Sequence, residues 1–400
     1  MIDLDVARMA GLHAGAPEEA GLTAKGLGRL TKGLQGLVDS GKIPGASAMI
    51  YRQGAVRYAH HIGAARPDGT SLRSDTIFRI YSMTKPIVSV AAMTLVEEGR
   101  LLLSEPLAKY IPAFATTRVG VQVEGKFETA DLKRPITIQD LMRHTSGISY
   151  GFTGVSPVNK AYHAAKLLRE DVSCAEHCES LASLPLQCQP GEAWEYGHST
   201  DVLGRVLEIV ESAPLSVILK ERIFEPLGMT DTAFHTPSDK LARRAELISA
   251  KTFDTLGIFR VDSTAPPALE SGGGGLVSTL PDYARFCAML LKGGQSPFAQ
   301  ILSPRLFRFM TANHLPPACS RASFLLSPGY GFGLGFAVRE QEGIAAAPGT
   351  LGEFNWGGAA GTAFWIAPAD QMFAILMIQT ADHSDTIRPL FRNLVYGALA

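Results

Sequence analysis

The sequence predicts an α+β fold in which strands from both ends of the chain form one sheet around a mostly helical insertion. Three observations lead to this prediction. Strand-like apolar runs occur between residues 45 and 80 and again after residue 330. The segment from about 105 to 265 instead shows helical periodicity with few strand-like runs. Gly and Pro number 40 and 24 among 400 residues, which indicates many short elements and loops rather than a coiled coil.

These patterns place the domain boundaries. We expect residues 1–104 and 266–400 to form one discontinuous α/β domain and residues 105–265 to form an inserted helical domain. A chain of 400 residues, 46% of them hydrophobic, is long enough to bury a large core in two lobes. Its 37 basic and 38 acidic residues give a net charge of −1, which leaves no basic excess for phosphates or an anionic membrane. Nucleic acid and membranes are therefore not expected partners.

The first lobe is predicted to begin with a helix and a hairpin. Residues 22–40 place leucines at helical spacing, and Gly41 follows as a typical helix terminator. Residues 45–51 and 55–62 are strand-like and flank a polar turn at Gly54. Two such runs joined by a short turn predict a β-hairpin.

Helices and further strands account for the rest of the chain. A strand over 76–80 leads into residues 82–99, which are apolar around most of the circumference, as in a helix buried inside a domain. Helical periodicity in the insertion covers residues 137–143, 160–169, 199–211 and 215–223. After the insertion, the pattern predicts a helix over 281–291, strands over 331–338, 361–366 and 372–379, and a final helix over 386–399.

One candidate nucleophile is Ser149, which lies in the G-x-S-x-G motif from Gly147 to Gly151. In an α/β-hydrolase this serine follows a buried strand and precedes a helix. Here residues 136–144 have helical periodicity, and Gly151 to Gly154 cannot start a firm helix. We therefore expect Ser149 to be a loop residue.

The second candidate nucleophile is Ser82, in the S-x-x-K motif that ends at Lys85. Residues three apart lie on one helix face, so the Lys85 amine can reach the Ser82 hydroxyl, and the helix N-terminus favours the developing alkoxide. Such an arrangement makes a weak nucleophile usable. Chance alone would give roughly one S-x-x-K in a chain of this composition. The setting adds weight, because Pro86 suits the first turn of the buried helix that follows.

Several motifs together give the chain a wider resemblance. They span Ser82 to Lys85, His144 to Gly147, Pro190 to Tyr196, Ser271 to Ser278, Gly329 to Gly335 and Trp356 to Gly361. In order and spacing they resemble the serine β-lactamase and penicillin-binding-protein superfamily, specifically its class C-like branch, and most of all the family VIII carboxylesterases. The resemblance covers nearly the whole chain. It implies a β-lactamase/transpeptidase-like fold, with an antiparallel sheet flanked by helices and an inserted mostly helical domain.

The resemblance implies a role for each matching residue. Ser82 would attack the ester carbonyl and carry the acyl group, while Lys85 lowers the barrier to removing its proton. Tyr196 would pass that proton to the leaving alcohol and activate the deacylating water, helped by the nearby positive charge of Lys85. The backbone N–H groups of Ser82 and Ala359 would form the oxyanion hole. The pocket walls in this fold would come from loops near 150–160, 230–265 and 315–350.

Two departures from the β-lactamase pattern bear on the substrate. Trp356, Gly357 and Gly358 replace the usual Lys-Thr-Gly, which removes a cation that would pair with a β-lactam carboxylate. The indole instead makes an apolar wall suited to neutral esters, so we expect these three residues to bind substrate. The usual Tyr-x-Asn becomes Tyr196-Gly-His198. His198 either contacts substrate or tunes Tyr196, or else it is a structural histidine in the first turn of the next helix.

Other residues have a structural interpretation beside a functional one. Tyr81 either lines the substrate pocket beside the nucleophile or belongs to the core. The glycine run 272–275 lacks the Lys-Ser/Thr ending of a phosphate loop, so close backbone packing is the expected reason for it. A zinc site could in principle use Cys174, His177, Cys178 and Cys188. Their spacing matches no common zinc pattern and the segment also fits an amphipathic helix, so we expect no metal site.

The sequence thus predicts a metal-free and cofactor-free serine esterase that hydrolyses small or short-acyl carboxylic esters through an acyl-Ser82 intermediate. Acyl transfer from the same intermediate, β-lactam or D-Ala-D-Ala cleavage, and a binding protein that retains the fold are the alternatives. Asp3 and Asp5 stand where a signal peptide would carry positive charge, and no apolar run approaches the ~18 residues needed to span a bilayer. We expect a cytoplasmic protein with five reduced cysteines. Its oligomeric state is left open.

Overall fold

The computed structural model describes residues 2–167, 169, 171–248, 252–253, 261–297 and 299–400. It contains a seven-stranded antiparallel sheet in the order β2-β1-β11-β10-β9-β8-β7. Strands β1 (Gly45–Arg52) and β2 (Ala55–Gly63) come from near the N-terminus. The other five are β7 (Tyr330–Phe332), β8 (Ala337–Arg339), β9 (Phe354–Gly357), β10 (Ala363–Ala367) and β11 (Met372–Met377). The predicted α+β fold with an antiparallel sheet is confirmed.

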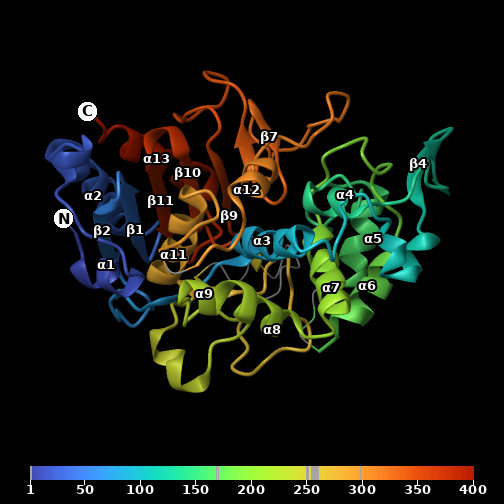
Figure 1. Ribbon diagram of the computed structural model, residues 1–400, viewed down its shortest axis with the longest axis horizontal. Helices are drawn as coiled ribbons and strands as arrows, with labels where there is room; N and C mark the ends of the chain where they lie inside the picture. Colours follow the sequence, from blue (N-terminus) through green and yellow to red (C-terminus); the bar gives the residue numbers. More distant parts are fainter. Residues whose placement is uncertain (1, 168, 170, 249–251, 254–260, 298) are drawn as a thin grey trace.

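Helices cover both faces of this sheet (Figure 1). Successive side chains of a strand point to opposite faces, so an apolar strand such as β11 contributes to two cores. Leu376 packs in the core that holds α2 (Ala24–Asp39) and α13 (Ser384–Tyr396). Its neighbour Ile375 packs in the larger core that holds α11 (Leu280–Leu291). This double burial explains why the strands are apolar runs rather than alternating ones.

Helix α3 (Thr84–Glu97) runs between the sheet and the helices α4 to α7 (Figure 1). Every residue from Thr84 to Leu95 is buried, which accounts for its apolar circumference. The helix begins two residues later than the sequence suggests, because Tyr81–Met83 forms a separate 3-10 turn, η2. Ser82 therefore lies on this turn at the mouth of α3.

The segment between the two halves of the sheet is mainly helical. Its helices are α4 (Ile138–Met142), α5 (Pro157–Ala165), α6 (Cys174–Ala182), α7 (Ser199–Glu211), α8 (Leu215–Leu219) and α9 (Glu225–Leu227), with a π-helical turn at Lys220–Phe224. Part of the predicted helix 160–169 lies outside the described residues. The sequence did not predict the hairpin of β4 (Val119–Val123) and β5 (Lys126–Ala130), whose side chains are mostly exposed. The proposed domain boundaries themselves stay a prediction.

Two further features near the C-terminal half differ from the sequence prediction. The predicted strand 331–338 is a hairpin, because the backbone turns between β7 and β8 at Gly335, whose φ of +100° favours glycine. Strand β9 was not predicted as a strand of its own. The remaining elements are α1 (Leu4–Ala10), α12 (Pro304–Met310), the paired strands β3 (Ile77–Arg79) and β6 (Val277–Thr279), and 3-10 turns at Pro17–Ala20, Leu107–Lys109, Pro112–Ala115, Ser238–Arg243 and Pro368–Asp370.

Within the described ranges, none of the helices has the length and apolar character needed to cross a bilayer. The cytoplasmic location stays a prediction. The five cysteines are free thiols.

Asp140, in the first turn of α4, is a buried carboxylate that anchors the loop leading into the site. It accepts hydrogen bonds from Arg134 at 2.5 and 2.9 Å and from Arg143 at 3.0 Å. It also accepts one from the Thr145 hydroxyl at 2.8 Å. Burial alone would raise the pKa of Asp140, but the hydrogen bonds from Arg134 and Thr137 lower it to about 2.

We predict that Asp140→Asn destabilises the protein by ~2–3 kcal/mol near pH 7, because it leaves Arg143 without its buried countercharge. Arg134 is 39% exposed, so its lost ion pair adds little. A carboxyl with a lowered pKa stabilises the fold above its ordinary value of 3.8, and this contribution disappears as the pH falls toward 2. Urea unfolding at pH 7 and below pH 4 measures the difference in unfolding free energy between wild type and variant.

Asp171→Asn, at an exposed pair with Arg169, is the control and should have little effect on stability. If the difference in unfolding free energy between wild type and Asp140→Asn does not shrink below pH 4, the ionised Asp140 carboxylate is not its cause.

Candidate active site

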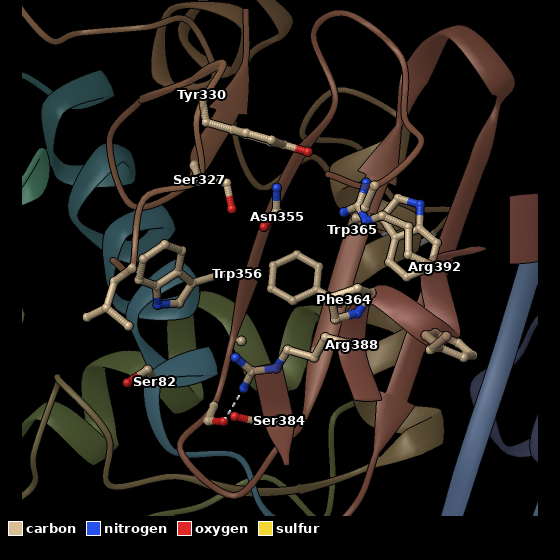
Figure 2. Close-up of a pocket in the computed structure, with 18 of the residues that line it drawn as sticks. Ser82, Ser327, Tyr330, Asn355, Trp356, Phe364, Trp365, Ser384, Arg388 and Arg392 are labelled. Atoms are coloured by element: carbon tan, nitrogen blue, oxygen red, sulfur yellow. Dashed lines mark hydrogen bonds between the residues drawn. The ribbon is translucent and has the colours of Figure 1, made fainter. Parts of the chain in front are cut away.

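A pocket of about 390 Å³ lies between the edge of the sheet and the mouth of α3 (Figure 2). It brings together most of the site residues predicted from the sequence: Ser82, Tyr196, Trp356, Gly357, Gly358 and Ala359. Two of the three predicted wall loops contribute to its lining, through Phe152, Leu325, Ser327, Tyr330, Ala345, Ala346 and Ala347. Residues 249–251 and 254–260 of the third predicted wall loop lie outside the described residues.

Ser82 and Lys85 are joined at the start of α3 as the helical spacing predicts. Lys85 Nζ donates to Ser82 Oγ at 3.3 Å and to the carbonyl oxygen of Gly273 at 2.7 Å. It also donates to Tyr150 Oη at 3.2 Å. Lys85 is 1% exposed, so these oxygens replace the water that would otherwise solvate the amine. Three fixed partners hold the nitrogen against the candidate nucleophile.

Tyr196 presents its hydroxyl at the wall of the pocket. Trp356 Nε1 donates to Tyr196 Oη at 3.3 Å, and Lys85 Nζ lies 4.5 Å from the centroid of the tyrosine ring. The indole of Trp356 is thus more than the apolar wall expected from the sequence, because its N–H also orients the phenol. Lys85 therefore lies next to both Ser82 and Tyr196, and these two residues line the same pocket.

Tyr150 is a neighbour of Lys85 that the sequence analysis did not single out. Burial raises the pKa of Tyr150 well above its ordinary value, and the negative charge of Asp201 raises it further. Tyr150 stays protonated at neutral pH and does not line the pocket. Its place three residues after the His144 to Gly147 motif was the signal that could have found it.

Tyr81 and His198, both predicted at the substrate site, do not line this pocket. The Tyr81 ring packs against Phe253 with the ring centroids 5.0 Å apart, and its backbone has a φ of +43°. Such a conformation costs energy for a non-glycine residue and places Ser82 at the end of a sharp turn. His198 is buried at the N-terminus of α7 and contacts the Tyr150 ring at 4.3 Å between centroids. The core interpretation of Tyr81 and the structural interpretation of His198 fit the structure.

Behind Lys85 lies a buried carboxylate, Asp201, which the sequence did not reveal. Its oxygens accept from the Ser271 hydroxyl at 2.5 Å and from the Gly273 N–H at 2.9 Å. Burial opposes its ionisation, but His198 and the charge of Lys85 hold the pKa of Asp201 below its ordinary value. Asp201 thereby holds the backbone N–H of Gly273, the residue whose carbonyl oxygen receives Lys85. An added Cβ at Gly273 would lie 2.4 Å from Asp201 Oδ2, which explains the glycine run by close packing.

Three buried side chains could offer ligands to a metal ion. The donor atoms of His177, His198 and Asp201 lie within 4.8 Å of one another. Hydrogen bonds account for much of this clustering, since Asp201 pairs with His198 Nδ1 at 3.3 Å and His177 Nδ1 bonds to Leu167 O at 3.1 Å. The nearby ammonium of Lys85 opposes a second cation there. Over the described ranges, the Cys/His set considered from the sequence supplies only His177 to any such group.

Ser149 lies in a loop, as predicted. Its hydroxyl donates to the Glu195 carboxylate and accepts from Asn159 Nδ2 at 3.0 Å. It is fully buried and does not line the pocket. These contacts give Ser149 a structural role.

Ala359 lies in the turn between β9 and β10, beside the nucleophile. In the part of the chain that the structure describes, its N–H makes no hydrogen bond to another backbone group. An added Cβ at Gly358 would lie 2.3 Å from the carbonyl oxygen of Ile80, so the turn packs directly against the residues before Ser82. The free N–H of Ala359 and the nucleophile thus share one pocket.

The sequence is similar to a known family and to several known proteins. The family model described as "Beta-lactamase" matches residues 30–396. An uncharacterized protein of Mycobacterium tuberculosis (strain CDC 1551 / Oshkosh) is 37% identical over 85% of this chain and 87% of its own length. Esterase EstB of Burkholderia gladioli is 28% identical over 89% of this chain and 91% of its own.

A solved structure has the same architecture. EstCE1, described as a hydrolase with promiscuous acyltransferase activity, superposes with a TM-score of 0.77 at 25% identity. The match covers 93% of this chain and 98% of the other. The β-lactamase/transpeptidase-like fold that the motifs implied is confirmed.

Proposed function

The chain belongs to the beta-lactamase family, and within that family we propose that it is a serine carboxylesterase that acts on small or short-chain acyl esters. The observation that supports this most is the contact of Lys85 Nζ with Ser82 Oγ inside a pocket that Tyr196 and Trp356 also line. An amine beside a serine hydroxyl at the mouth of a buried helix is an arrangement that activates a weak nucleophile.

The proposed reaction has two steps. Ser82 Oγ attacks the carbonyl carbon while its proton passes, by way of the Tyr196 hydroxyl, to the leaving alkoxide oxygen, and the alcohol departs; the positive charge of Lys85 lowers the barrier to removing that proton. Water then attacks the acyl-Ser82 carbonyl, its proton returns to Ser82 Oγ, and the carboxylic acid leaves. The N–H groups of Ser82 and Ala359 would stabilise the oxyanion in both steps. No metal or cofactor is required by this scheme.

The residue at the position of the family's lysine supports esters over β-lactams as substrates. Trp356 occupies the position where the family's lysine would pair with a β-lactam carboxylate. Two similar proteins are named an esterase and a hydrolase with promiscuous acyltransferase activity, which supports ester substrates for this chain. Acyl transfer to an alcohol is the second candidate, since it uses the same acyl-enzyme and differs only in the nucleophile that reaches it.

A series of p-nitrophenyl esters from acetate to laurate, assayed beside a chromogenic cephalosporin, tests this proposal. We expect kcat/KM to be highest for the short acyl groups, because about 390 Å³ is near the lower end of the usual range of ligand pockets. A burst of p-nitrophenol and an acyl adduct on Ser82 by mass spectrometry should accompany turnover. Adding an alcohol measures transfer directly. Cephalosporin turnover as fast as that of the best ester would contradict the ranking.

A further inference from the structure

Arg388, from α13, lines the pocket on the side opposite Trp356 and reaches the turn between β9 and β10 (Figure 2). Its Nη2 donates to the carbonyl oxygen of Gly358 at 2.5 Å and to that of Thr362 at 3.1 Å. These two carbonyls lie at the two ends of the turn that joins β9 to β10. One guanidinium nitrogen therefore clamps the turn that presents Ala359.

The Gly358 carbonyl and the Ala359 N–H belong to the same peptide unit. A hydrogen bond accepted by the carbonyl draws electron density toward the oxygen and makes the N–H of that unit a stronger donor. Gly358 O already accepts from the Gly361 N–H at 2.9 Å, so the arginine adds a second and charged donor. Because a peptide unit is planar, fixing the carbonyl also fixes the direction of the N–H.

The positive charge of Arg388 is not neutralised inside the pocket. No Asp or Glu is among the residues that line the pocket in the described part of the chain. The other lining arginine, Arg392, is already paired with Glu353. Burial lowers the pKa of Arg388 to about 10, so the group stays cationic at neutral pH. An uncompensated cation in a partly buried wall favours negative charge that develops nearby.

Gly357 provides the space for this arrangement. An added Cβ at Gly357 would lie 2.9 Å from Arg388 Cζ and 3.0 Å from its Nη2. Any larger residue would push the guanidinium off the turn. The sequence analysis expected Gly357 to bind substrate. It did not predict that the Arg388 guanidinium, from α13, occupies the space left by the missing side chain of Gly357.

We propose that Arg388 is the positioning residue of the oxyanion hole. It holds and polarises the Gly358–Ala359 peptide, so that the Ala359 N–H donates a hydrogen bond to the oxyanion that forms on the ester carbonyl and later on the acyl-Ser82 carbonyl. The proposal rests on the serine esterase function proposed above. The effect acts on charge that develops only in the tetrahedral state, so it should appear in kcat rather than in ground-state binding.

The test compares Arg388→Met with wild type on p-nitrophenyl butyrate and on an anionic ester of similar length, p-nitrophenyl hemisuccinate. Loss of an oxyanion donor costs ~10²–10³ in kcat, so loss of its support should cost ~10–50-fold, equally on both esters and with KM little changed. A boronic acid, which forms a tetrahedral anion on serine, should bind more weakly by a similar factor. Arg388→Lys should recover part of the loss, because lysine keeps the positive charge but lacks the planar guanidinium with its fixed donors.

Arg308→Met, which removes an exposed arginine on α12, is the matched control and should leave all these values near wild type. Thermal unfolding checks that each variant folds, and Gly357→Ala, which displaces the guanidinium without removing it, is a second route to the same loss. Unchanged kcat on the neutral ester for both variants would overturn the proposal. A loss confined to the anionic ester would also overturn it, and would instead make Arg388 a site for a substrate carboxylate.

Failure of the underlying function is recognised separately. If wild type forms no Ser82 adduct with either ester, the esterase proposal itself is wrong. If wild type forms the Ser82 adduct and Arg388→Met forms it equally fast, only the role proposed for Arg388 is wrong.

Discussion

Replacing Ser82 with alanine is expected to reduce ester hydrolysis by at least ~10³-fold, because the covalent step loses its nucleophile and only binding and the oxyanion site remain. The fold should be preserved, since Ser82 lies on a turn whose backbone is held by the buried helix behind it. Steady-state hydrolysis of p-nitrophenyl acetate and the mass of the protein after incubation with substrate measure the effect. The variant should show neither a burst nor an adduct.

The serine of the G-x-S-x-G motif provides the internal control. Ser149→Ala removes a buried hydroxyl that contacts Glu195 and Asn159, so it is expected to lower stability without preventing acylation of Ser82. Labelling of Ser82 in the folded fraction of this variant should match wild type. Loss of labelling in Ser149→Ala together with an active Ser82→Ala would reverse the assignment of the nucleophile.

The parts of the site that the sequence predicts are those whose geometry is local. Ser82 and Lys85 are three residues apart, on the 3-10 turn and the first turn of α3 that follows it, so local helical spacing brings their side chains together. The third motif is one continuous segment, Trp356 to Ala359. Its residues lie together whatever the rest of the chain does, so the sequence alone predicts that they share one part of the site. Motif order then placed Tyr196 in the same pocket. These predictions depended on short spacing or on resemblance, and the pocket contains all of these residues except Lys85, which contacts Ser82 from behind the pocket wall.

The parts that the sequence did not predict depend on contacts between distant elements. Arg388 follows the first turn of α13, and nothing in its surroundings along the chain shows that α13 folds back against the β9–β10 turn. Asp201 occupies an ordinary position in the first turn of α7, where an acidic residue favours the helix for local reasons. Its contact with Gly273 joins residues that are far apart in the sequence. The β4–β5 hairpin was missed because its two strands are short and mostly exposed, and the alternation of Val119, Val121 and Val123 was the signal that could have found it.

Two tyrosines contact Lys85, and the structure separates their proposed roles. Tyr150 receives the direct hydrogen bond at 3.2 Å, but it does not line the pocket and its raised pKa keeps its proton in place. Tyr196 lines the pocket and accepts a hydrogen bond from Trp356, so its oxygen is available to a leaving alcohol or to water. The phenol that transfers protons should therefore be Tyr196, while Tyr150 positions Lys85.

Tyr196→Phe is accordingly expected to lower kcat by ~10²–10⁴-fold, the usual contribution of a general acid or base. Tyr150→Phe removes one partner of Lys85 but no proton carrier, and we expect a loss of about 10-fold or less, consistent with one lost hydrogen bond to a charged group. Stopped-flow measurement of p-nitrophenol release separates acylation from deacylation, and Tyr196→Phe should slow both, because the same phenol serves the alcohol and the water. Equal losses in the two variants would mean that Tyr150 shares the proton transfer. A larger loss in Tyr150→Phe would move that role to the buried tyrosine and leave Tyr196 as part of the pocket wall.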